Sequence, residues 1–266
     1  QFARCAYAHY LNYGLRLTER EESGFTSLHM GNIYHEALER YSKKLDREST
    51  DWFSVTDAKR DELAMEAINE VIDEYAGFGI FDTAESQHSI SHMKAVFKQT
   101  VWALTTQIRR GSFVPERFEF SFYESLDMAN DVTVDIKGRV DRTDTYTDEG
   151  RLFVKVLDYK SGNTVFDLVK LYYGTQLQLA VYMDAVMEQK KEALKQVSVE
   201  PGGMLYYHID DPVIDLKDVT PGTELSEEEI DQMILKKLKP DGLINSDEKA
   251  YRGMDRDFEK SSDVIP

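Results

Sequence analysis

The chain has 266 residues, enough for one large domain or two small ones, and its apolar fraction of 41% is ordinary for a globular protein. Its net charge of −17 argues against a protein that coats nucleic acid through bulk electrostatics, so a role on DNA would have to depend on a local basic patch or a metal ion. No apolar run approaches the ~20 residues of a membrane helix, and no secretory signal pattern opens the chain.

The two ends of the sequence and its cysteine content add two expectations. The chain starts at Gln1 and stops abruptly in SSDVIP, so we expect a fragment of a longer protein. Cys5 is the single cysteine, which excludes an internal disulfide and fits a reducing, cytoplasmic setting.

The first part of the sequence is predicted to be helical. A first helix over 25–46 has apolar residues at helical spacing: Leu28, Ile33, Ala37, Leu38 and Tyr41. A second helix is predicted over 61–75, with Thr56 and Asp57 as candidate capping residues. A third spans about 86–110, where Gly111 is a natural stop.

The middle of the sequence alternates between apolar and polar residues, as β-strands do. Three strands are predicted over 117–126, 132–146 and 151–160, and TDEG at 147–150 is a plausible hairpin turn. After them we predict a helix at about 172–192, a strand at 202–210 and a helix at 226–238. Ser226 and Glu229 have the spacing of a capping box. The acidic, turn-rich stretch after 239 is predicted to be the least structured.

The stretch FVKVLDYKSGN (153–163) contains the candidate catalytic residues. Residues two apart on a strand share a face, so Asp158 and Lys160 follow Val154 and Val156 on one side of the strand. The preceding strand holds Asp141, and antiparallel pairing could bring this carboxylate close to Asp158. Two carboxylates so close repel each other unless a cation lies between them, and a hard divalent ion is a simple solution.

Four motifs in a fixed order give the sequence a specific resemblance. GNIYHEALE (31–39), GRVDR (138–142), DYKSG (158–162) and QLQLAVY (176–182) together resemble the RecB-like branch of the PD-(D/E)xK nucleases. With CAYAHYLNYGLRL (5–17) in front, the chain is also similar to the AddB subunits of bacterial AddAB helicase–nuclease complexes, which process double-strand breaks. The resemblance covers nearly the whole chain.

The resemblance implies an α/β fold. A PD-(D/E)xK core with a mixed central sheet is flanked by helices, and a helical N-terminal portion carries His35. We therefore expect a single nuclease domain over 1–266. Within it, 1–112 is the helical portion, 113–240 the catalytic core and 241–266 a poorly structured tail.

The resemblance also implies which residues form the site. His35, Asp141, Asp158 and the Tyr159 backbone carbonyl match the family's ligands for Mg²⁺ or Mn²⁺, and a histidine ligand should favour manganese in affinity. Three further residues match catalytic or supporting positions: Lys160, Gln178 and Tyr182. Glu119 is a further possible acidic residue near the metal, although an exposed Glu between buried Phe118 and Phe120 explains it equally well.

The implied activity is that of a metal-dependent deoxyribonuclease, an exonuclease that hydrolyses single-stranded DNA in double-strand break repair and recombination. The implied partners are a DNA end and an AddA-type helicase–nuclease subunit. The family also holds a [4Fe–4S] cluster, for which Cys5 matches the first ligand; the other three lie outside this chain, so we expect no cluster in this fragment. Near the site, Arg142, Lys155 and Lys160 are expected to line a channel for the strand.

Other interpretations of the same residues stay open at this stage. Taken singly, His35 is more often a structural histidine, Asp141 could lie on a solvated strand face, and Cys5 could be a buried apolar residue. Gln178 and Tyr182 could be simple neighbours on a helix. The alternative function is a catalytically inactive structural or DNA-guiding module of the same complex. A two-carboxylate glycosidase would leave Lys160 and His35 unexplained.

Overall fold

The structure is a computed structural model, and it describes residues 5–17, 26–77, 84–128, 132–214 and 225–266. Its elements, in chain order, are α1 (Ala6–His9), the π-helix η1 (Tyr10–Gly14), α2 (Ser27–Arg47), α3 (Asp57–Ala76), α4 (Ala84–Arg110), β1 (Val114–Met128), β2 (Val132–Asp148), β3 (Arg151–Lys160), α5 (Leu168–Tyr172), α6 (Gln178–Ala193), β4 (Ser198–His208), α7 (Glu227–Lys237), β5 (Asp241–Ile244) and α8 (Glu248–Met254). No helix in these ranges is long and apolar enough to cross a membrane.

One five-stranded sheet with the order β1-β2-β3-β4-β5 forms the centre of the molecule. Only the β3–β4 pair is parallel, and the other neighbours are antiparallel, so the sheet is mixed as expected. β3 is the middle strand. Its residues from Leu152 to Val154 and from Val156 to Tyr159 are buried, because both faces of the sheet are covered.

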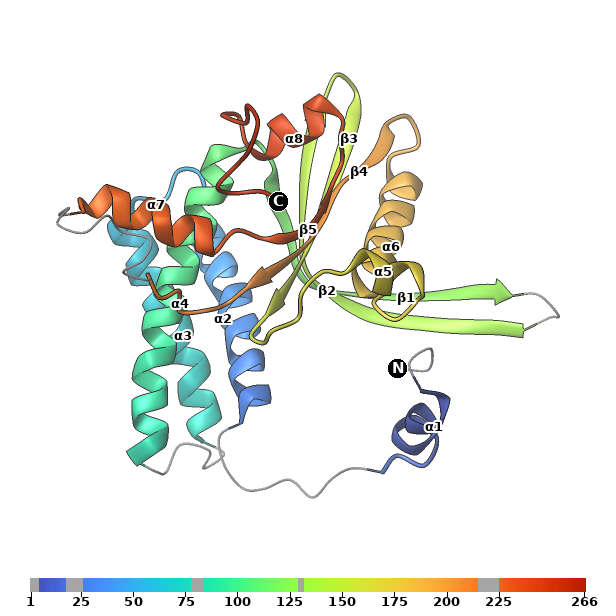
Figure 1. The fold of residues 1–266 in the computed structure, drawn as a ribbon, viewed down its shortest axis with the longest axis horizontal. Helices are drawn as coiled ribbons and strands as arrows, with labels where there is room; N and C mark the ends of the chain where they lie inside the picture. Colours follow the sequence, from blue (N-terminus) through green and yellow to red (C-terminus); the bar gives the residue numbers. More distant parts are fainter. Residues whose placement is uncertain (1–4, 18–25, 78–83, 129–131, 215–224) are drawn as a thin grey trace.

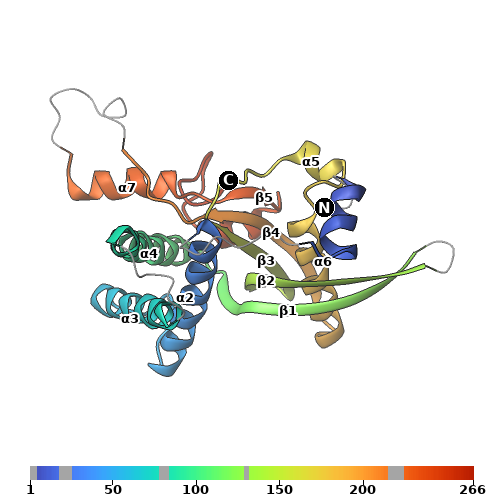
Figure 2. The same ribbon diagram turned by 90° about the horizontal axis from the view of Figure 1, so that it is seen from below.

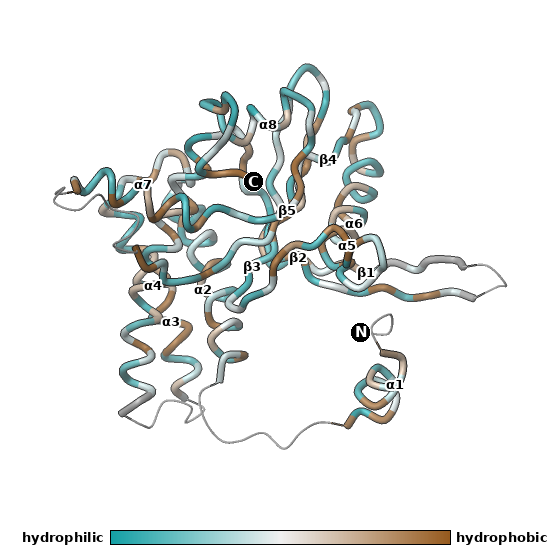
Figure 3. Tube along the Cα trace, viewed as in Figure 1, coloured by the Kyte–Doolittle hydropathy of each residue, from teal (hydrophilic) through white to brown (hydrophobic). Residues whose placement is uncertain are grey.

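Different helices cover the two faces of the sheet (Figures 1 and 2). On one face, α2, α3 and α4 pack through a large cluster that includes Leu157 and Tyr159 of β3. On the other face, α6 packs against Val154 and Val156. Hydropathy alternates along α2, α3 and α4 (Figure 3), as expected for helices that bury one side.

The predicted helices of the N-terminal portion are confirmed with small shifts in their bounds. Thr56 caps α3, its side chain accepting a hydrogen bond from the Lys59 amide. In α2 the apolar residues from Ile33 to Tyr41 are buried, whereas Leu28, in the first turn, is 71% exposed. The start of that predicted helix at residue 25 lies outside the described residues.

The predicted helix over 172–192 is in fact two helices with a turn between them. Gly174, at φ +71°, ends α5, and its amide and that of Thr175 donate to carbonyls of the last turn. α6 then begins at Gln178. The glycine carried this signal in the sequence, and its consequence is that the QLQLAVY motif lies at the start of α6 and not in its middle.

The tail after residue 239 is ordered, contrary to expectation. β5 pairs with β4, α8 follows, and the side chains of Val264 and Ile265 are buried against α7 and α8. The acidic residues that suggested disorder make local hydrogen bonds instead. Asp247 caps α8, and Asp241 accepts from the Phe166 amide at 2.6 Å.

The β1–β2 hairpin extends well beyond the rest of the sheet. β3 pairs with β2 only over Arg142–Asp148, so residues 121–128 and 132–139 pair only with each other and project from the body as a two-stranded arm (Figures 1 and 2). The base of this arm is where the candidate site lies.

Candidate metal centre

Four elements converge on the end of β3. His35 of α2 places Nε2 3.0 Å from the carbonyl oxygen of Tyr159, and its Nδ1 lies 3.3 Å from Glu119 Oε1 and 3.4 Å from Asp141 Oδ1. The three side chains of His35, Glu119 and Asp141 thus offer ligand atoms that all lie within 4.8 Å of one another. Imidazole, two carboxylates and a backbone carbonyl form a donor set suited to a divalent cation such as Mn²⁺ or Mg²⁺.

Asp141 links His35 and Glu119 to the central sheet through a hydrogen bond to β3. Its Oδ2 accepts a hydrogen bond from the Tyr159 amide at 2.6 Å, just beyond the last β2–β3 ladder pair, Arg142 with Leu157. The side chain therefore replaces a backbone partner for β3 and holds the Tyr159 peptide in place. The carbonyl of Tyr159, in the next peptide unit, lies 3.0 Å from Nε2 of His35, whereas the two carboxylates face Nδ1 of the same ring.

Charge in this group shifts the pKa of His35. Burial alone lowers it, but hydrogen bonds to Asp141 and Glu119, and their negative charges, outweigh burial and raise the pKa to about 10. Histidine must lose its proton to bind a metal, so a cation that enters this group takes the place of the imidazolium charge between the two carboxylates.

Glu119 reaches the group through an unusual backbone conformation. It has φ +50°, in the left-handed region that non-glycine residues rarely adopt. Phe118 consequently packs in the cluster of α2–α4, whereas Phe120 packs in the cluster of α6. The simple alternation that would bury Phe118 and Phe120 on one face and expose Glu119 is therefore wrong, and the Glu119 side chain is only 9% exposed.

Asp158 and Lys160 lie next to this group, on the α6 face of β3. The carboxylate of Asp158 is buried, with Oδ2 2.5 Å from Lys160 Nζ, and it is not part of the group formed by His35, Glu119 and Asp141. Burial and the charge of Asp141 raise its pKa to about 6, against the lowering effect of Lys160. A second cation near Asp158 would stabilise its charged form.

Gln178, the first residue of α6, organises these side chains. Its Oε1 accepts from Lys160 Nζ at 3.0 Å, and its Nε2 donates to Asp158 Oδ1 at 2.6 Å and to Tyr182 Oη at 2.9 Å. All predicted site residues except Cys5 therefore lie in one region. Cys5 is exposed at the start of α1, where its Sγ caps the helix.

Gly138 of GRVDR allows this packing. A Cβ built there would lie 2.7 Å from Phe122 and 3.2 Å from Tyr182. Phe122 and Tyr182 meet edge to face at 5.8 Å, which fixes the first turns of α6 against β1 and β2. The glycine in the motif thus serves the placement of Gln178, a role that the sequence alone did not reveal.

Two of the three basic residues expected to line a DNA channel are buried instead. Arg142 and Lys155 form an ion-paired cluster with Asp144, and Arg142 donates from Nε and Nη2 to its two oxygens at 2.6 Å. Arg142 is 1% and Asp144 0% exposed. The expectation was wrong for both cations because β2 and β3 are covered on this face by α4; only Lys160 lies at the rim.

Two separate cavities open onto the site. An acidic cavity of about 350 Å³ is lined by His35, Glu36, Glu39, Glu119 and Arg139. A larger basic cleft of about 1120 Å³ is lined by Lys160 and Gln178 and extends to Lys137 and Lys170. His35 and Glu119 thus face an acidic cavity, and Lys160 faces a basic cleft.

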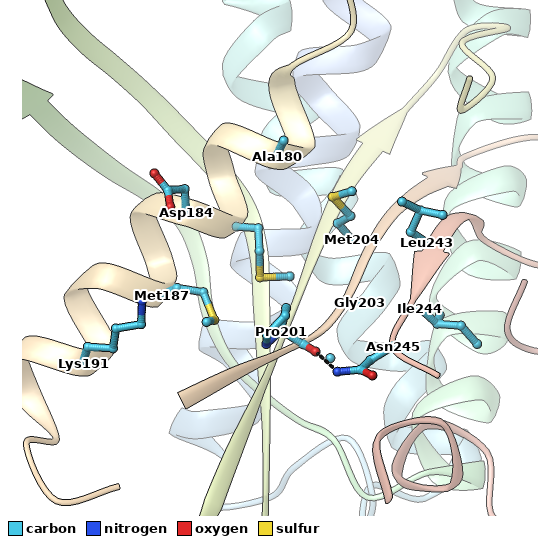
Figure 4. Close-up of a pocket in the computed structure, with 12 residues that line it drawn as sticks. Ala180, Asp184, Met187, Lys191, Pro201, Gly203, Met204, Leu243, Ile244 and Asn245 are labelled. Carbon is cyan, nitrogen blue, oxygen red and sulfur yellow. Dashed lines mark hydrogen bonds between the residues drawn. The ribbon is translucent and has the colours of Figure 1, made fainter. Parts of the chain in front are cut away.

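A third cavity, of about 440 Å³, lies away from the site between α6 and the β4–β5 pair (Figure 4). Met187, Met204, Leu243 and Ile244 give it a largely apolar lining. None of the predicted site residues lines it. Its chemistry gives no indication of catalysis.

Comparisons with known proteins agree with this geometry. The PD-(D/E)XK nuclease superfamily matches residues 1–261. The similar proteins include AddB-type subunits of ATP-dependent helicase/deoxyribonucleases. The whole chain is 35% identical to the one from Alkaliphilus metalliredigens and 32% to one from Clostridium botulinum, and 97% of it is 37% identical to the one from Lachnoclostridium phytofermentans. The chain spans between 21% and 23% of the length of these relatives. On the family match over almost its full length, the chain belongs to the PD-(D/E)XK nuclease superfamily.

Proposed function

We propose that this chain is a metal-dependent deoxyribonuclease domain, an exonuclease acting on single-stranded DNA. The observation that carries the proposal is the convergence of imidazole, carboxylates and a backbone carbonyl with Lys160 on the end of one buried strand. The side chains of His35, Asp141 and Asp158 come from α2, β2 and β3, all of which pack in the core. Rigid elements of this kind hold catalytic groups more accurately than loops do.

The metal ligands in this proposal are His35, Asp141, Asp158 and the Tyr159 carbonyl, with Glu119 as a fifth donor. They fit Mn²⁺ or Mg²⁺, and the imidazole favours Mn²⁺ in affinity. Asp158 Oδ2 supports its inclusion, because this buried oxygen has no hydrogen bond and only the ion pair with Lys160. A bound divalent cation would supply an activated water at neutral pH and neutralise negative charge on the scissile phosphate.

Lys160, Gln178 and Tyr182 complete the proposed machinery. Lys160 Nζ lies at the rim of the basic cleft, where it can donate hydrogen bonds to a phosphate oxygen as charge develops. Gln178 fixes that ammonium group and Asp158 relative to each other through both ends of its amide. Tyr182 orients Gln178 and is a positioning residue.

The relatives extend the proposal to an assembly. They are subunits of ATP-dependent helicase/deoxyribonucleases, so we propose that this chain acts in such a complex beside an AddA-type subunit, in repair and recombination at DNA ends. Cys5, exposed at the start of α1, is available as one ligand of a [4Fe–4S] cluster whose other ligands would lie outside this chain.

The test is hydrolysis of a 5′-labelled DNA single strand by the chain in Mn²⁺ or Mg²⁺, compared with Asp158→Asn and with Asp184→Asn. Asp184 is an exposed carboxylate on α6, outside the site, and serves as the control. We expect cleavage by the wild-type chain and the control and none by Asp158→Asn. Equal residual cleavage in all three would refute the proposal, and no cleavage in any would favour the inactive, DNA-guiding alternative.

A further inference from the structure

The basic cleft has a lining whose charge is opposite in sign to the net charge of the chain. It is the larger of the two cavities that open onto the site, and its lining contains the lysines Lys137, Lys160 and Lys170 and one carboxylate, Asp135. Lys160 is ion-paired with Asp158, and Lys170 with Asp167. The whole chain carries a net charge of −17, and the neighbouring acidic cavity has three glutamates against Arg139 and His35. A polyanion is therefore attracted to this cleft and repelled from most of the remaining surface.

Lys137 and Lys170 come from two different elements that line the cleft, β2 and α5. Lys137 is exposed on the arm, opposite Tyr123 in the β1–β2 register. Lys170 is exposed on α5, and its ion pair with Asp167 is a loose contact of 3.7 Å. Neither side chain belongs to the metal-binding group or contacts Asp158, so any function of these two lysines is binding and not chemistry.

Two exposed tyrosines lie next to Lys170. Tyr172 ends α5 and Tyr173 follows it, with 84% and 71% of their surfaces exposed and their rings edge to face at 5.2 Å. The chain then turns at Gly174, which lines the cleft. Exposed aromatic rings beside a basic groove are typical of proteins that bind single-stranded nucleic acid, because every base can stack on them.

We propose that the basic cleft holds a DNA single strand, with Lys137 and Lys170 on its phosphates and Tyr172 and Tyr173 stacked on its bases. The strand would pass between the arm and α5 and reach Lys160 with one phosphate. This inference rests on the proposed function, because the cleft is catalytically relevant only if Lys160 acts on a phosphodiester. It assigns substrate binding to residues outside the metal-binding group.

The experiment is equilibrium binding of a fluorescent 15-nucleotide oligo-dT in EDTA over a range of salt concentrations. We compare the wild-type chain with Lys137→Ala/Lys170→Ala, with Tyr172→Ala/Tyr173→Ala and with Lys191→Ala. Lys191 is the control: it is half exposed and lies thirteen residues along α6 from Gln178, at the far end of that helix. EDTA excludes any contribution from a divalent cation.

The lysine and tyrosine double variants should differ in how their DNA affinity depends on salt. Removal of each lysine should lower the slope of log affinity against log salt by about 0.7 and the affinity at 50 mM salt by about tenfold. Removal of the tyrosines should lower the affinity at least fivefold and leave the slope unchanged, because stacking releases no counterions. Lys191→Ala should bind as the wild type does.

Other outcomes separate this inference from the proposed function. Equal affinity and slope for Lys137→Ala/Lys170→Ala and Lys191→Ala would overturn the cleft proposal, as would failure of the wild-type chain to bind or a preference for oligo-U over oligo-dT. Binding as expected with no hydrolysis in Mn²⁺ would leave the cleft proposal standing and refute the nuclease. Hydrolysis of bis(p-nitrophenyl) phosphate, which is too small to fill the cleft, should be unchanged in the cleft variants.

Discussion

Two clusters of charged side chains lie on β2 and β3. They differ in whether their charged groups meet a cavity. The closed cluster, formed by Arg142, Asp144 and Lys155, lies on the α4 face of β2 and β3. The open cluster consists of the candidate metal ligands His35, Glu119 and Asp141 together with Asp158 and Lys160, and it meets two cavities at the end of β3. Asp141 and Arg142 are adjacent in the chain and belong to different clusters.

The closed cluster satisfies its charges internally. Asp144 lies opposite Lys155 in the register and accepts both hydrogen bonds from Arg142. Burial raises the pKa of Asp144, but its two cations outweigh this and hold the pKa below its usual range. In the open cluster, Asp158 Oδ2 has an ion pair with Lys160 but no hydrogen bond, and burial together with the charge of Asp141 raises the pKa of Asp158. The charges of the closed cluster are neutralised within the fold, whereas those of the open cluster can bind a ligand.

The largest expected effect is on stability, from the closed cluster. Asp144→Asn leaves Arg142 and Lys155 buried without a counter-charge, so we expect a loss of ~3–5 kcal/mol in the free energy of unfolding. Urea denaturation followed by circular dichroism measures it. The triple variant with Met at 142 and 155 and Leu at 144 should recover much of the loss, because no charge is left buried. A shift below 1 kcal/mol for Asp144→Asn would contradict the assignment.

The next effect is on activity, from the open cluster. Lys160→Met should lower the rate of DNA hydrolysis by about 10²–10³-fold, the usual cost of removing one donor to a developing charge. Its unfolding free energy should change less than that of Asp144→Asn, since Lys160 is at the rim. Lys191→Met is the control for the loss of a lysine. If Lys160→Met lost as much stability as Asp144→Asn and kept its activity, Lys160 would have a structural and not a catalytic role.

A smaller effect is expected at the glycine that seats α6. Gly138→Ala introduces a Cβ that overlaps Phe122 and crowds Tyr182, so we expect a destabilisation of ~1–3 kcal/mol together with reduced hydrolysis. Gly162→Ala is the matched control, because a Cβ there meets no atom within 4 Å and its φ is not in the left-handed region. Identical thermal unfolding of the two variants would show that Gly138 does not position the helix.

The smallest effect concerns the backbone at Glu119. Glu119→Gly and Glu119→Ala both remove the carboxylate, but only glycine relieves the left-handed conformation, so Glu119→Gly should be the more stable of the two by ~1 kcal/mol. Both should bind Mn²⁺ more weakly than the wild type. Equal stability of the two variants would show that the conformation at Glu119 stores no strain.

The sequence allowed the open cluster to be predicted better than the closed one. Alternation predicted that Asp158 and Lys160 share a strand face with Val154 and Val156, and in the structure α6 packs on that face. Alternation could not show that the opposite face of β2 and β3 is buried as well, which is why Arg142 and Lys155 were predicted to contact DNA. That burial depends on α4, which comes from more than thirty residues away in the chain.

Other features depended on local geometry that residue patterns do not encode. The left-handed backbone at Glu119 has no sequence signature, since the residue is not glycine. The tail after residue 239 is rich in acidic and turn-forming residues, but these serve as helix caps and hydrogen-bond acceptors, so composition alone was misleading. Gly174 is a helix-stop signal in the sequence, and it divides the helix predicted over 172–192.

Titration calorimetry with Mn²⁺ measures whether the open cluster holds a divalent cation. Asp135→Asn is the control for Asp141→Asn, because Asp135 is an exposed carboxylate on the same strand and lies in the arm. We expect the wild-type chain and Asp135→Asn to bind manganese and Asp141→Asn to lose this binding. Unchanged manganese binding in a folded Asp141→Asn variant would contradict it.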